Sequence, residues 1–399
     1  MRIAIVADDL YPGFGGQAAA TGGHVEALLA RGHEVRALAG VEREPSEPSP
    51  GVSVERLPVW RPGEKQTHLA VPDSGKIRNL LEWAEVVQIN TPTPLALRTL
   101  QLARRVAVPS VVGFHTQEES AALHFSLLRR PVTATLWRWY SSLYQRPDCL
   151  VAPTVFAARL AGSYTTRPVH VVSNGIRLPR IEAAGDERSS ALRQRLLSGR
   201  RFLISHVGRL THEKRPQDLI SFAEQLAHRR RDWEMVIAGT GPLRRVLERR
   251  TAKLGLADRV RFLGYVSERE KEDLLMASDL FLMPSPTELQ SIATLEAMAR
   301  SCAVVAADFE TSAIGEMVRE SGCGLCYRPE RMDEATGDVS QLLDRTEELR
   351  RLRRNAAEAA RRHDVHRSGR LLEGIYASLL RVRSGGPKPA AGPLERMEA

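Results

Sequence analysis

Short runs of apolar residues alternate with longer segments of helical periodicity along most of the chain. In the first half the apolar runs lie at 2–7, 34–39, 52–57, 85–90, 110–114, 149–153 and 170–173. In the second half they lie at 202–207, 234–239, 259–264, 279–284 and 303–307. Strands that are apolar throughout are typical of parallel sheets that helices cover on both faces. The pattern predicts an α/β protein with two Rossmann-like, doubly wound parallel-sheet domains.

A polar and charged segment without strand character, 178–201, separates the two blocks. We place the N-terminal domain at 1–177 and the C-terminal domain at 178–366. A late helix at 367–383 follows the second block, and we expect it to pack back on the N-terminal domain. The tail at 384–399 is rich in Pro, Gly and Ala, which predicts disorder.

The composition agrees with two ordinary globular domains. The chain has 399 residues, of which 43% are hydrophobic and 26% charged, and this excludes a disordered, collagen-like or coiled-coil chain. No apolar run approaches the roughly 18 residues of a transmembrane helix, and the N-terminus lacks the pattern of a signal peptide. We therefore expect a cytoplasmic location, which includes peripheral attachment to the inner face of the plasma membrane.

The net charge of +9 favours anionic partners: nucleotides, phosphorylated substrates or an anionic membrane surface. The sequence carries no helix-turn-helix, zinc-finger or RNA-binding-sheet signature, so nucleic acid is not an expected partner. The four cysteines include one C-x-x-C pair, Cys323 and Cys326, without a second pair or two histidines nearby. We interpret both as small apolar residues in or beside a strand, and we expect no metal site.

Two glutamates follow a predicted strand of the second block, at the edge where doubly wound domains bind ligands. Glu288 lies in the loop after 279–284, and Glu296 lies in the helix that we expect to begin near Gln290 or Ser291. Carboxylates beside the unpaired N–H groups of a helix start suit a ligand with both hydroxyls and phosphate. The spacing alone leaves a plainer interpretation open: a glutamate near a helix N-terminus for dipole reasons, and a surface glutamate later.

Arg209 and Lys214 follow the strand at 202–207, where they could neutralise a diphosphate or simply belong to a solvated basic loop. Two glycine-containing turns, 237–242 and 11–17, also follow strands and permit close approach of the backbone. The turn at 11–17 is not a convincing dinucleotide fingerprint, because no suitably placed ribose-binding acid follows about 20 residues on. A nicotinamide enzyme is therefore disfavoured.

Four stretches in this order resemble a retaining glycosyltransferase of the GT-B fold, of the family 4 type. They are the glycine-rich loop with 22–35, GRLTHEK at 208–214, IAGTGP at 237–242 with 259–266, and SPTELQSIATLEAMA at 285–299 followed by 303–308. The resemblance covers nearly the whole chain and implies two facing Rossmann-like domains with an interdomain cleft. It also implies kinship with bacterial enzymes that glycosylate diacylglycerol, phosphatidylinositol or polyprenol-linked acceptors.

The resemblance implies a role for each matching position. Arg209 and Lys214 match the basic pair that holds the donor diphosphate and supports the departing nucleotide. Glu288 matches the glutamate beside the transferred sugar, and His115 matches a histidine that faces the donor sugar. The positions implied for donor binding are Gly15, Gly16, Gly241, Tyr265, Val266, Gln290, Ser291, Ile292 and Glu296.

Within this donor-binding set, Glu296 matches the glutamate that binds the nucleotide ribose. Gly15 and Gly16 match the loop that approaches the donor phosphate, and the backbone around Tyr265 and Val266 matches the stretch near the nucleotide base. The resemblance thus implies that the donor is a nucleotide-sugar.

The chain departs from many relatives directly after Glu288, where Leu289, Gln290 and Ser291 replace an aromatic residue and glycine. The departure leaves the donor sugar open, and UDP- and GDP-sugars are both candidates. The basic pair and helix N–H groups can stabilise the departing diphosphate without a metal, and no cofactor is expected beside the donor. Retention would follow if the acceptor attacks from the leaving-group face and a diphosphate oxygen takes its proton.

The segment 126–147 bears on the acceptor. From 120 to 147 the chain has no Asp or Glu but four arginines: Arg129, Arg130, Arg138 and Arg146. Three aromatic residues, Trp137, Tyr140 and Tyr144, fall on one helical face. Such residues are typical of an interfacial helix on anionic lipid. Together with the resemblance to enzymes that glycosylate lipids, this implies a membrane glycerolipid or other lipid-linked acceptor. The alternative is that the aromatic face packs into the domain. A soluble small-molecule or sugar-phosphate acceptor, and a non-catalytic GT-B binding protein, are further alternatives.

Overall fold

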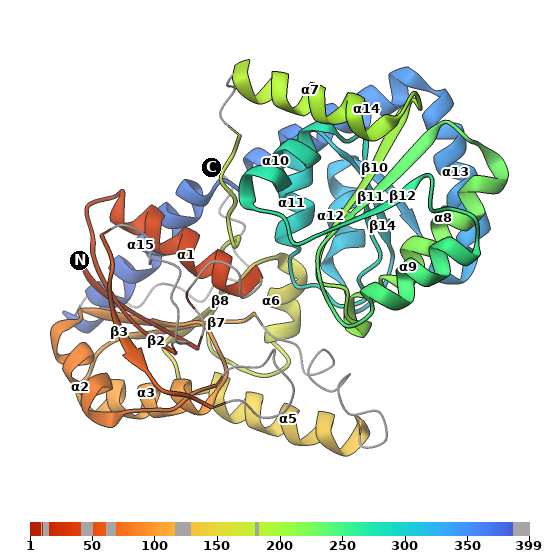
Figure 1. Cartoon of the computed structure of the whole chain (residues 1–399). Coiled ribbons are helices and arrows are strands. Elements are labelled where there is room, and N and C mark those ends of the chain that lie inside the picture. The colour runs from red at the N-terminus through yellow and green to blue at the C-terminus, as the bar shows by residue number, and fades with distance from the viewer. Residues whose placement is uncertain are drawn as a thin grey trace. The chain divides into compact units, whose positions relative to one another are not determined.

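The chain divides into two compact units. The computed structural model describes residues 1–8, 10, 16–40, 51–60, 69–115, 129–179 and 183–385, with the backbone alone at 129–133 and 183–186. The N-terminal unit is Met1–Ile176 together with the chain from Asp364 onward, and the C-terminal unit is Arg177–His363. Each unit has strands in the middle and helices outside them (Figure 1).

A parallel sheet forms the centre of the N-terminal unit. From edge to edge its described strands are β3 (Ser53–Leu57), β2 (Glu34–Gly40), β1 (Arg2–Ala7), β6 (Val86–Ile89), β7 (Ser110–Gly113), β8 (Cys149–Ala152) and β9 (Val169–Val171). The chain starts at β1, winds outward to β3, and then returns to β6 on the other side of β1. This reversal of strand order is the switch point of a doubly wound sheet. An antiparallel hairpin, β4 (Val59–Trp60) with β5 (Leu69–Ala70), is paired separately.

The described helices of the N-terminal unit include the last one that the structure describes. They are α1 (Gly16–Leu29), α2 (Ser74–Trp83), α3 (Pro94–Arg105), α5 (Arg129–Tyr144), α6 (Val155–Ala161) and α15 (Val365–Arg383). Helix α15 packs closely on α1, because a Cβ placed on Gly369 would lie 2.7 Å from the Cβ of Ala27. Leu372 and Tyr376 of α15 join Ile3 in one buried apolar cluster. Helix α15 therefore completes the core of the unit in which the chain begins.

The C-terminal unit repeats the doubly wound plan. Its described parallel strands, from edge to edge, are β12 (Val260–Gly264), β11 (Trp233–Ala238), β10 (Phe202–Val207), β13 (Leu280–Met283), β14 (Ala303–Ala307) and β15 (Gly324–Tyr327). The strand order reverses between β10 and β13, which makes these two neighbours the switch point.

Helices cover both faces of the C-terminal sheet (Figure 1). They are α7 (Ala183–Leu197), α8 (Gln217–Arg229), α9 (Arg244–Lys253), α10 (Glu268–Ala277), α11 (Ile292–Ala299), α12 (Ala313–Ser321), α13 (Met332–Asp344) and α14 (Thr346–Arg361). Phe202 and Ile204 of β10 belong to one buried cluster, and Leu203 between them belongs to another. Because successive side chains of a strand point to opposite faces, both faces need apolar residues, and the strand is apolar throughout.

The prediction of two Rossmann-like domains is confirmed, and most predicted strands lie within one or two residues of the observed ones. The segment 178–201, predicted only as polar and without strand character, contains helix α7. Two arginines fix this helix to the C-terminal unit: Arg188 lies 3.4 Å from Asp273, and Arg193 lies 2.8 Å from Asp279. From residue 386 on, the predicted disordered tail lies outside the described residues.

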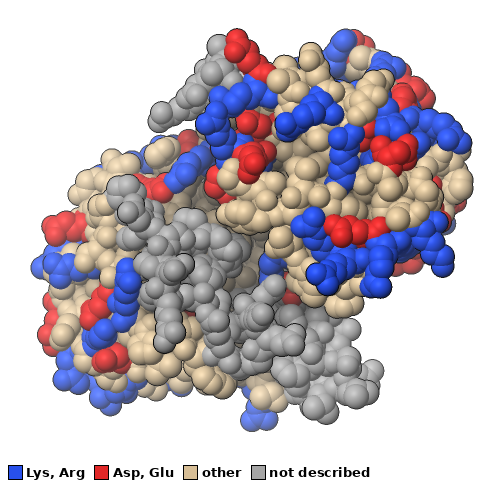
Figure 2. Space-filling view, viewed as in Figure 1, with Lys and Arg blue, Asp and Glu red and all other residues tan. Residues whose placement is uncertain are grey.

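Charged residues are spread over the visible surface, and basic side chains gather along α9 (Figure 2). These are Arg244, Arg245, Arg249, Arg250 and Lys253. Among the helices that the structure describes, none is long and apolar enough to span a bilayer.

Candidate active site

The switch point of the C-terminal sheet brings together two loops that the sequence singles out. Arg209 and Lys214 follow β10, and Glu288 follows β13. These strands are parallel neighbours, so their carboxyl ends meet at the same edge of the sheet. Ligands of doubly wound sheets bind at this edge.

Lys214 and Glu288 form an ion pair across this switch point. The Nζ of Lys214, at the end of the short 3₁₀ helix His212–Lys214, lies 2.6 Å from Oε1 of Glu288. The Glu288 side chain is only 13% exposed. Its carbonyl oxygen accepts a hydrogen bond of 2.7 Å from the N–H of Ala313, which anchors the loop to the start of α12. The pair places a fixed cation at the sheet edge, where an oxyanion could find a donor.

Arg209 is held by a different carboxylate. Its Nη2 donates to Oε1 of Glu213 at 2.5 Å, within the same loop. Glu213 is buried, whereas about half of the Arg209 side chain is exposed. The buried carboxylate therefore fixes the orientation of a guanidinium that remains accessible. Sequence reasoning missed Glu213, although its i, i+4 spacing from Arg209 was a usable signal.

The turn at 237–242 packs against the loop that carries Arg209. The N–H of Leu210 donates to Thr240 O at 2.8 Å, and the N–H of Gly208 donates to Ala238 O at 3.0 Å. A Cβ placed on Gly241 would lie 2.4 Å from the carbonyl oxygen of Leu210. Glycine is required there by contact between two protein loops. The predicted contact of Gly241 with the donor stays a prediction.

Helix α11 begins shortly after Glu288 in the sequence. Its first turn carries the predicted anion-binding N–H groups. Ser291 is its N-cap, and its side chain accepts a hydrogen bond of 3.2 Å from Thr294 N. Gln290 and Ser291 are buried, and Nε2 of Gln290 lies 3.4 Å from Nδ1 of His363. The helix starts at Ile292, one residue after the predicted start near Gln290 or Ser291. The N–H groups of a first helical turn lack intrahelical acceptors and can serve a phosphate.

Glu296 lies one turn further along α11 and has its own cation. Its Oε1 is 2.8 Å from Nζ of Lys271 on α10. Burial raises the pKa of the Glu296 carboxyl, and Lys271 acts against this rise. The two glutamates of the motif are thus paired with different lysines. No sequence motif pointed to Lys271, because the contact arises from the packing of α10 beside α11.

Tyr265 and Val266 follow β12, at the same end of the sheet. The Tyr265 side chain is 77% exposed, and Val266 packs on a buried cluster beneath it. An exposed aromatic ring at a sheet edge can provide an apolar face for a nucleobase. Its predicted place near the base stays a prediction.

The N-terminal unit holds the remaining candidates. His115 follows β7, and its ring lies against Gly113, where an added Cβ would come within 2.4 Å of Nε2. Burial lowers the pKa of His115 to about 3, with a smaller contribution from His24, so the imidazole is neutral near pH 7. A neutral imidazole can donate and accept a hydrogen bond with a sugar hydroxyl. Gly16 is the exposed first residue of α1, and Gly15 lies outside the described residues.

A buried polar network supports the start of α1. The hydroxyl of Tyr376 on α15 donates to Gln88, whose Nε2 donates to Asn90 Oδ1 at 2.9 Å. Asn90 Nδ2 donates to Thr21 Oγ1 at 2.8 Å, and Gln17 Nε2 donates to the Asn90 carbonyl. The network links the C-terminal helix to the residue after Gly16, at the predicted phosphate loop.

The predicted lipid-facing surface of α5 needs a correction. Tyr140 is only 5% exposed, because its ring lies among Tyr144 and Tyr164, at centroid distances of 6.0 and 6.4 Å. Assigning Tyr140 to a membrane surface was wrong, and the packing alternative holds for it. Trp137 is 44% exposed. Arg138 and Arg146 are exposed, whereas the side chains of Arg129 and Arg130 lie outside the described residues.

Two protein families match the chain in succession. Residues 14–180 match Glycosyltransferase Family 4, and residues 188–359 match Glycosyl transferases group 1. Two doubly wound units, each with candidate ligand residues at strand ends, agree with the GT-B fold of these families. The chain belongs to the group 1 and family 4 glycosyltransferases of this fold.

Individual relatives span most of the chain. Alpha-D-kanosaminyltransferase of Streptomyces kanamyceticus is 28% identical over 287 residues, 70% of this chain and 72% of the relative. GDP-mannose-dependent alpha-(1-6)-phosphatidylinositol dimannoside mannosyltransferase of Mycobacterium tuberculosis is 29% identical over 355 residues, 88% of this chain and 90% of the relative. A solved structure of Anabaena HepE with UDP and glucose has a TM-score of 0.74 at 20% identity and covers 95% of this chain and 100% of its own.

Proposed function

We propose that the chain is a retaining, metal-independent hexosyltransferase that uses a UDP- or GDP-sugar. Its acceptor is the hydroxyl of a membrane glycerolipid or another lipid-linked molecule. The observation that carries the proposal is the ion pair of Lys214 with Glu288 at the sheet switch point, directly before the N-terminus of α11.

The chemistry needs stabilisation of the departing diphosphate. When the bond from the anomeric carbon to the diphosphate oxygen breaks, negative charge develops on that oxygen. Lys214, Arg209 and the first N–H groups of α11 are donors that can be aimed at this charge without reorganisation. Their carboxylate partners hold the two cations in place before the donor binds.

Retention follows from attack on the same face that the leaving group vacates. The acceptor oxygen forms the new bond to the anomeric carbon, and its proton passes to the diphosphate oxygen. Neither protein carboxylate has to form a glycosyl-enzyme bond. Glu288 is a positioning group in this scheme, because its Oε1 is engaged by Lys214.

The donor contacts follow the same scheme. Glu296 receives the ribose hydroxyls, Tyr265 and Val266 face the base, and Gly16 and His115 approach the phosphate and sugar. The Anabaena structure, which holds UDP and glucose, supports a fold suited to such a donor. The scheme uses no metal and no cofactor besides the donor.

A lipid acceptor is supported by exposed side chains on α5 and directly after it, and by one relative. Trp137, Arg138 and Arg146 expose an aromatic ring and two cations, a combination that suits an anionic interface. The match to the mycobacterial relative, which is named for a phosphatidylinositol dimannoside, covers 90% of that relative's length.

A soluble acceptor is the second candidate, and specific observations favour it too. Burial of Tyr140 reduces the aromatic surface that α5 could place on lipid. Relatives also include a 2-deoxystreptamine glucosyltransferase of Streptomyces kanamyceticus, 28% identical over 297 residues.

The experiment that tests the proposal is a donor and acceptor matrix. Release of nucleoside diphosphate is measured for UDP- and GDP-hexoses with diacylglycerol or phosphatidylinositol vesicles, and with soluble aminocyclitols or sugar phosphates. The proposal expects release that depends on one donor and on lipid. Release with soluble acceptors alone would move the assignment to the second candidate. Release with none of them would support the more remote alternative, a non-catalytic binding protein.

A further inference from the structure

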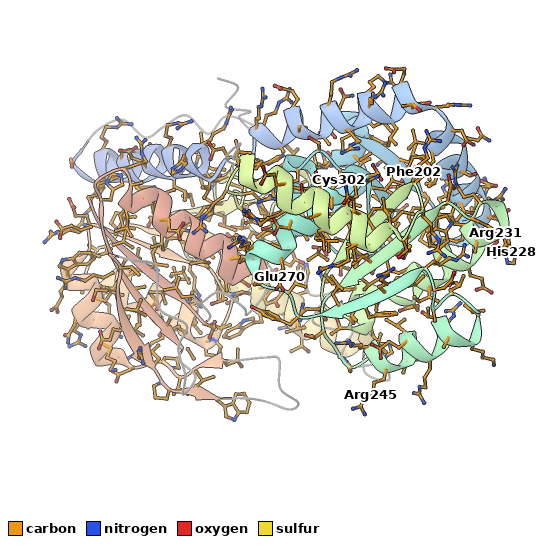
Figure 3. All side chains as sticks on the ribbon, turned by 45° about the horizontal axis from the view of Figure 1, so that its top comes forward. Phe202, His228, Arg231, Arg245, Glu270 and Cys302 are labelled. Atoms are coloured by element: carbon orange, nitrogen blue, oxygen red, sulfur yellow. The ribbon has the colours of Figure 1, made fainter. Side chains whose placement is uncertain are left out.

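Lys271 is a largely buried cation that none of the motifs singled out in the sequence contains. It lies in the first turn of α10, whose start is fixed by a capping box between Ser267 and Glu270. Glu270, labelled in Figure 3, marks the end of the helix on which Lys271 lies. The Lys271 side chain is only 14% exposed. Lysine side chains are rarely buried unless they pair with an acidic group. The partners of Lys271 therefore indicate its role.

Lys271 has an inner and an outer carboxylate partner. Its Nζ lies 2.8 Å from Glu296 Oε1 and 2.7 Å from Glu268 Oε2. Glu296 is 18% exposed, whereas Glu268 is 81% exposed, so water screens the outer contact much more strongly. The inner contact with Glu296 is therefore the one that matters electrostatically.

The charges around Glu296 come from its own helix and from α10. Burial is the main influence and raises the pKa of the Glu296 carboxyl, and Glu268 adds to the rise, whereas Lys271 and Arg300 oppose it. Arg300 donates from Nη1 to the backbone carbonyl of Glu296 at 3.2 Å and from Nη2 to the Glu272 carboxylate at 2.7 Å. Lys271 is therefore the cation in direct contact with the Glu296 carboxylate among the described residues.

We infer that Lys271 is a positioning residue for the donor: it keeps Glu296 ionised and oriented, so that its carboxylate accepts hydrogen bonds from the ribose of the nucleotide. This inference rests on the proposed function, in which Glu296 receives the ribose. Lys271 contacts Oε1, which leaves Oε2 to accept from a hydroxyl. Without Lys271, the carboxyl would protonate at higher pH and turn toward water. An ionised acceptor binds a hydroxyl more strongly than a neutral one.

The test compares a ribonucleoside diphosphate with its 2′,3′-dideoxy analogue. The base is whichever of uridine or guanosine diphosphate raises the melting temperature of the wild-type protein. Calorimetry should give the wild type a preference of about tenfold or more for the ribose form, as expected for a hydrogen bond to a charged group. Lys271→Met should lose most of this preference, and Lys271→Arg should keep much of it. In turnover, Lys271→Met should raise the donor KM more than it lowers kcat.

A pH series separates positioning from simple packing. In Lys271→Met, affinity for the ribonucleotide should begin to fall at a higher pH than in the wild type as the solution is acidified. The dideoxy analogue should show no such difference. Lys253→Met, on the exposed face of α9, and Glu268→Gln, at the outer contact, are matched controls that should keep wild-type preference.

The outcomes separate this inference from the proposed function. A wild-type ribose preference that survives in Lys271→Met would overturn the role of Lys271 and leave the donor site standing. If Lys271→Met does not fold, Lys271→Gln is used with the same criterion. A wild-type protein that binds neither diphosphate would overturn the proposed function itself, and this inference with it.

Discussion

Replacing Lys214 by alanine removes one of the two cations proposed to stabilise the leaving diphosphate. The Nζ is already fixed, 2.6 Å from Glu288, so it acts without reorganisation when charge develops. Loss of one such preorganised donor costs about 10²–10³ in turnover, or roughly 2.7–4 kcal/mol of transition-state stabilisation. Arg209 remains, held by Glu213, so activity should fall without vanishing. Because the charge grows as the bond breaks, kcat should fall more than donor affinity.

The assay is initial-rate release of nucleoside diphosphate over a range of donor concentrations, with circular dichroism to confirm folding. Lys253→Ala is the matched control, because Lys253 is exposed on α9 away from these contacts. It should keep wild-type rates. A folded Lys214→Ala protein with kcat within about threefold of the wild type would refute the reasoning, because one donor at such a site is worth far more.

Three further predictions follow from the contacts and burial described above. Adding EDTA should leave the transfer rate unchanged, and a rate that requires Mg²⁺ or Mn²⁺ would argue against the proposed diphosphate site. Replacing Arg138 and Arg146 with Gln should weaken binding to phosphatidylglycerol vesicles, measured by sedimentation, by about 1 kcal/mol per residue. Tyr140→Ala should instead lower the free energy of unfolding by about 3–5 kcal/mol. Burial lowers the pKa of His206 to about 4, so as pH falls from 6.5 toward 4 the unfolded chain gains a proton that the folded protein does not. The free energy of unfolding, measured with urea, should therefore fall by up to about 1.4 kcal/mol per pH unit because of this group. His206→Leu should remove that part of the pH dependence, and an unchanged pH dependence in the variant would contradict the prediction.

The strands were predictable where burial on both faces leaves a continuous apolar run, as in β10 and β11. The hairpin of β4 and β5 was not, because its strands have two residues each and depend on distant partners. One such partner is Asp8, whose Oδ1 accepts from the N–H of Ala70 at 2.7 Å. The local hydrophobic pattern cannot predict a contact between residues so far apart in the chain.

The candidate site was predictable as far as its residues follow strands. Residues such as Glu288 could be located from the sequence because parallel strands bring their carboxyl ends to one edge. Their partners could not: Lys271 reaches Glu296 only because two helices pack side by side. The same limit explains Tyr140. Helical spacing groups it with Trp137, and both rings lie beside Tyr164, at centroid distances of 6.4 and 6.3 Å. The spacing does not reveal that Tyr140 is buried while Trp137 stays 44% exposed.

The stereochemistry of transfer tests the central claim most directly. A UDP- or GDP-hexose of α configuration is incubated with the enzyme and its acceptor, and the anomeric proton of the product is followed by NMR. The account predicts an α-linked product, with one nucleoside diphosphate released per sugar transferred, both with and without EDTA. A β-linked product would contradict same-face attack assisted by the diphosphate oxygen, and transfer without release of the diphosphate would contradict the proposed leaving group.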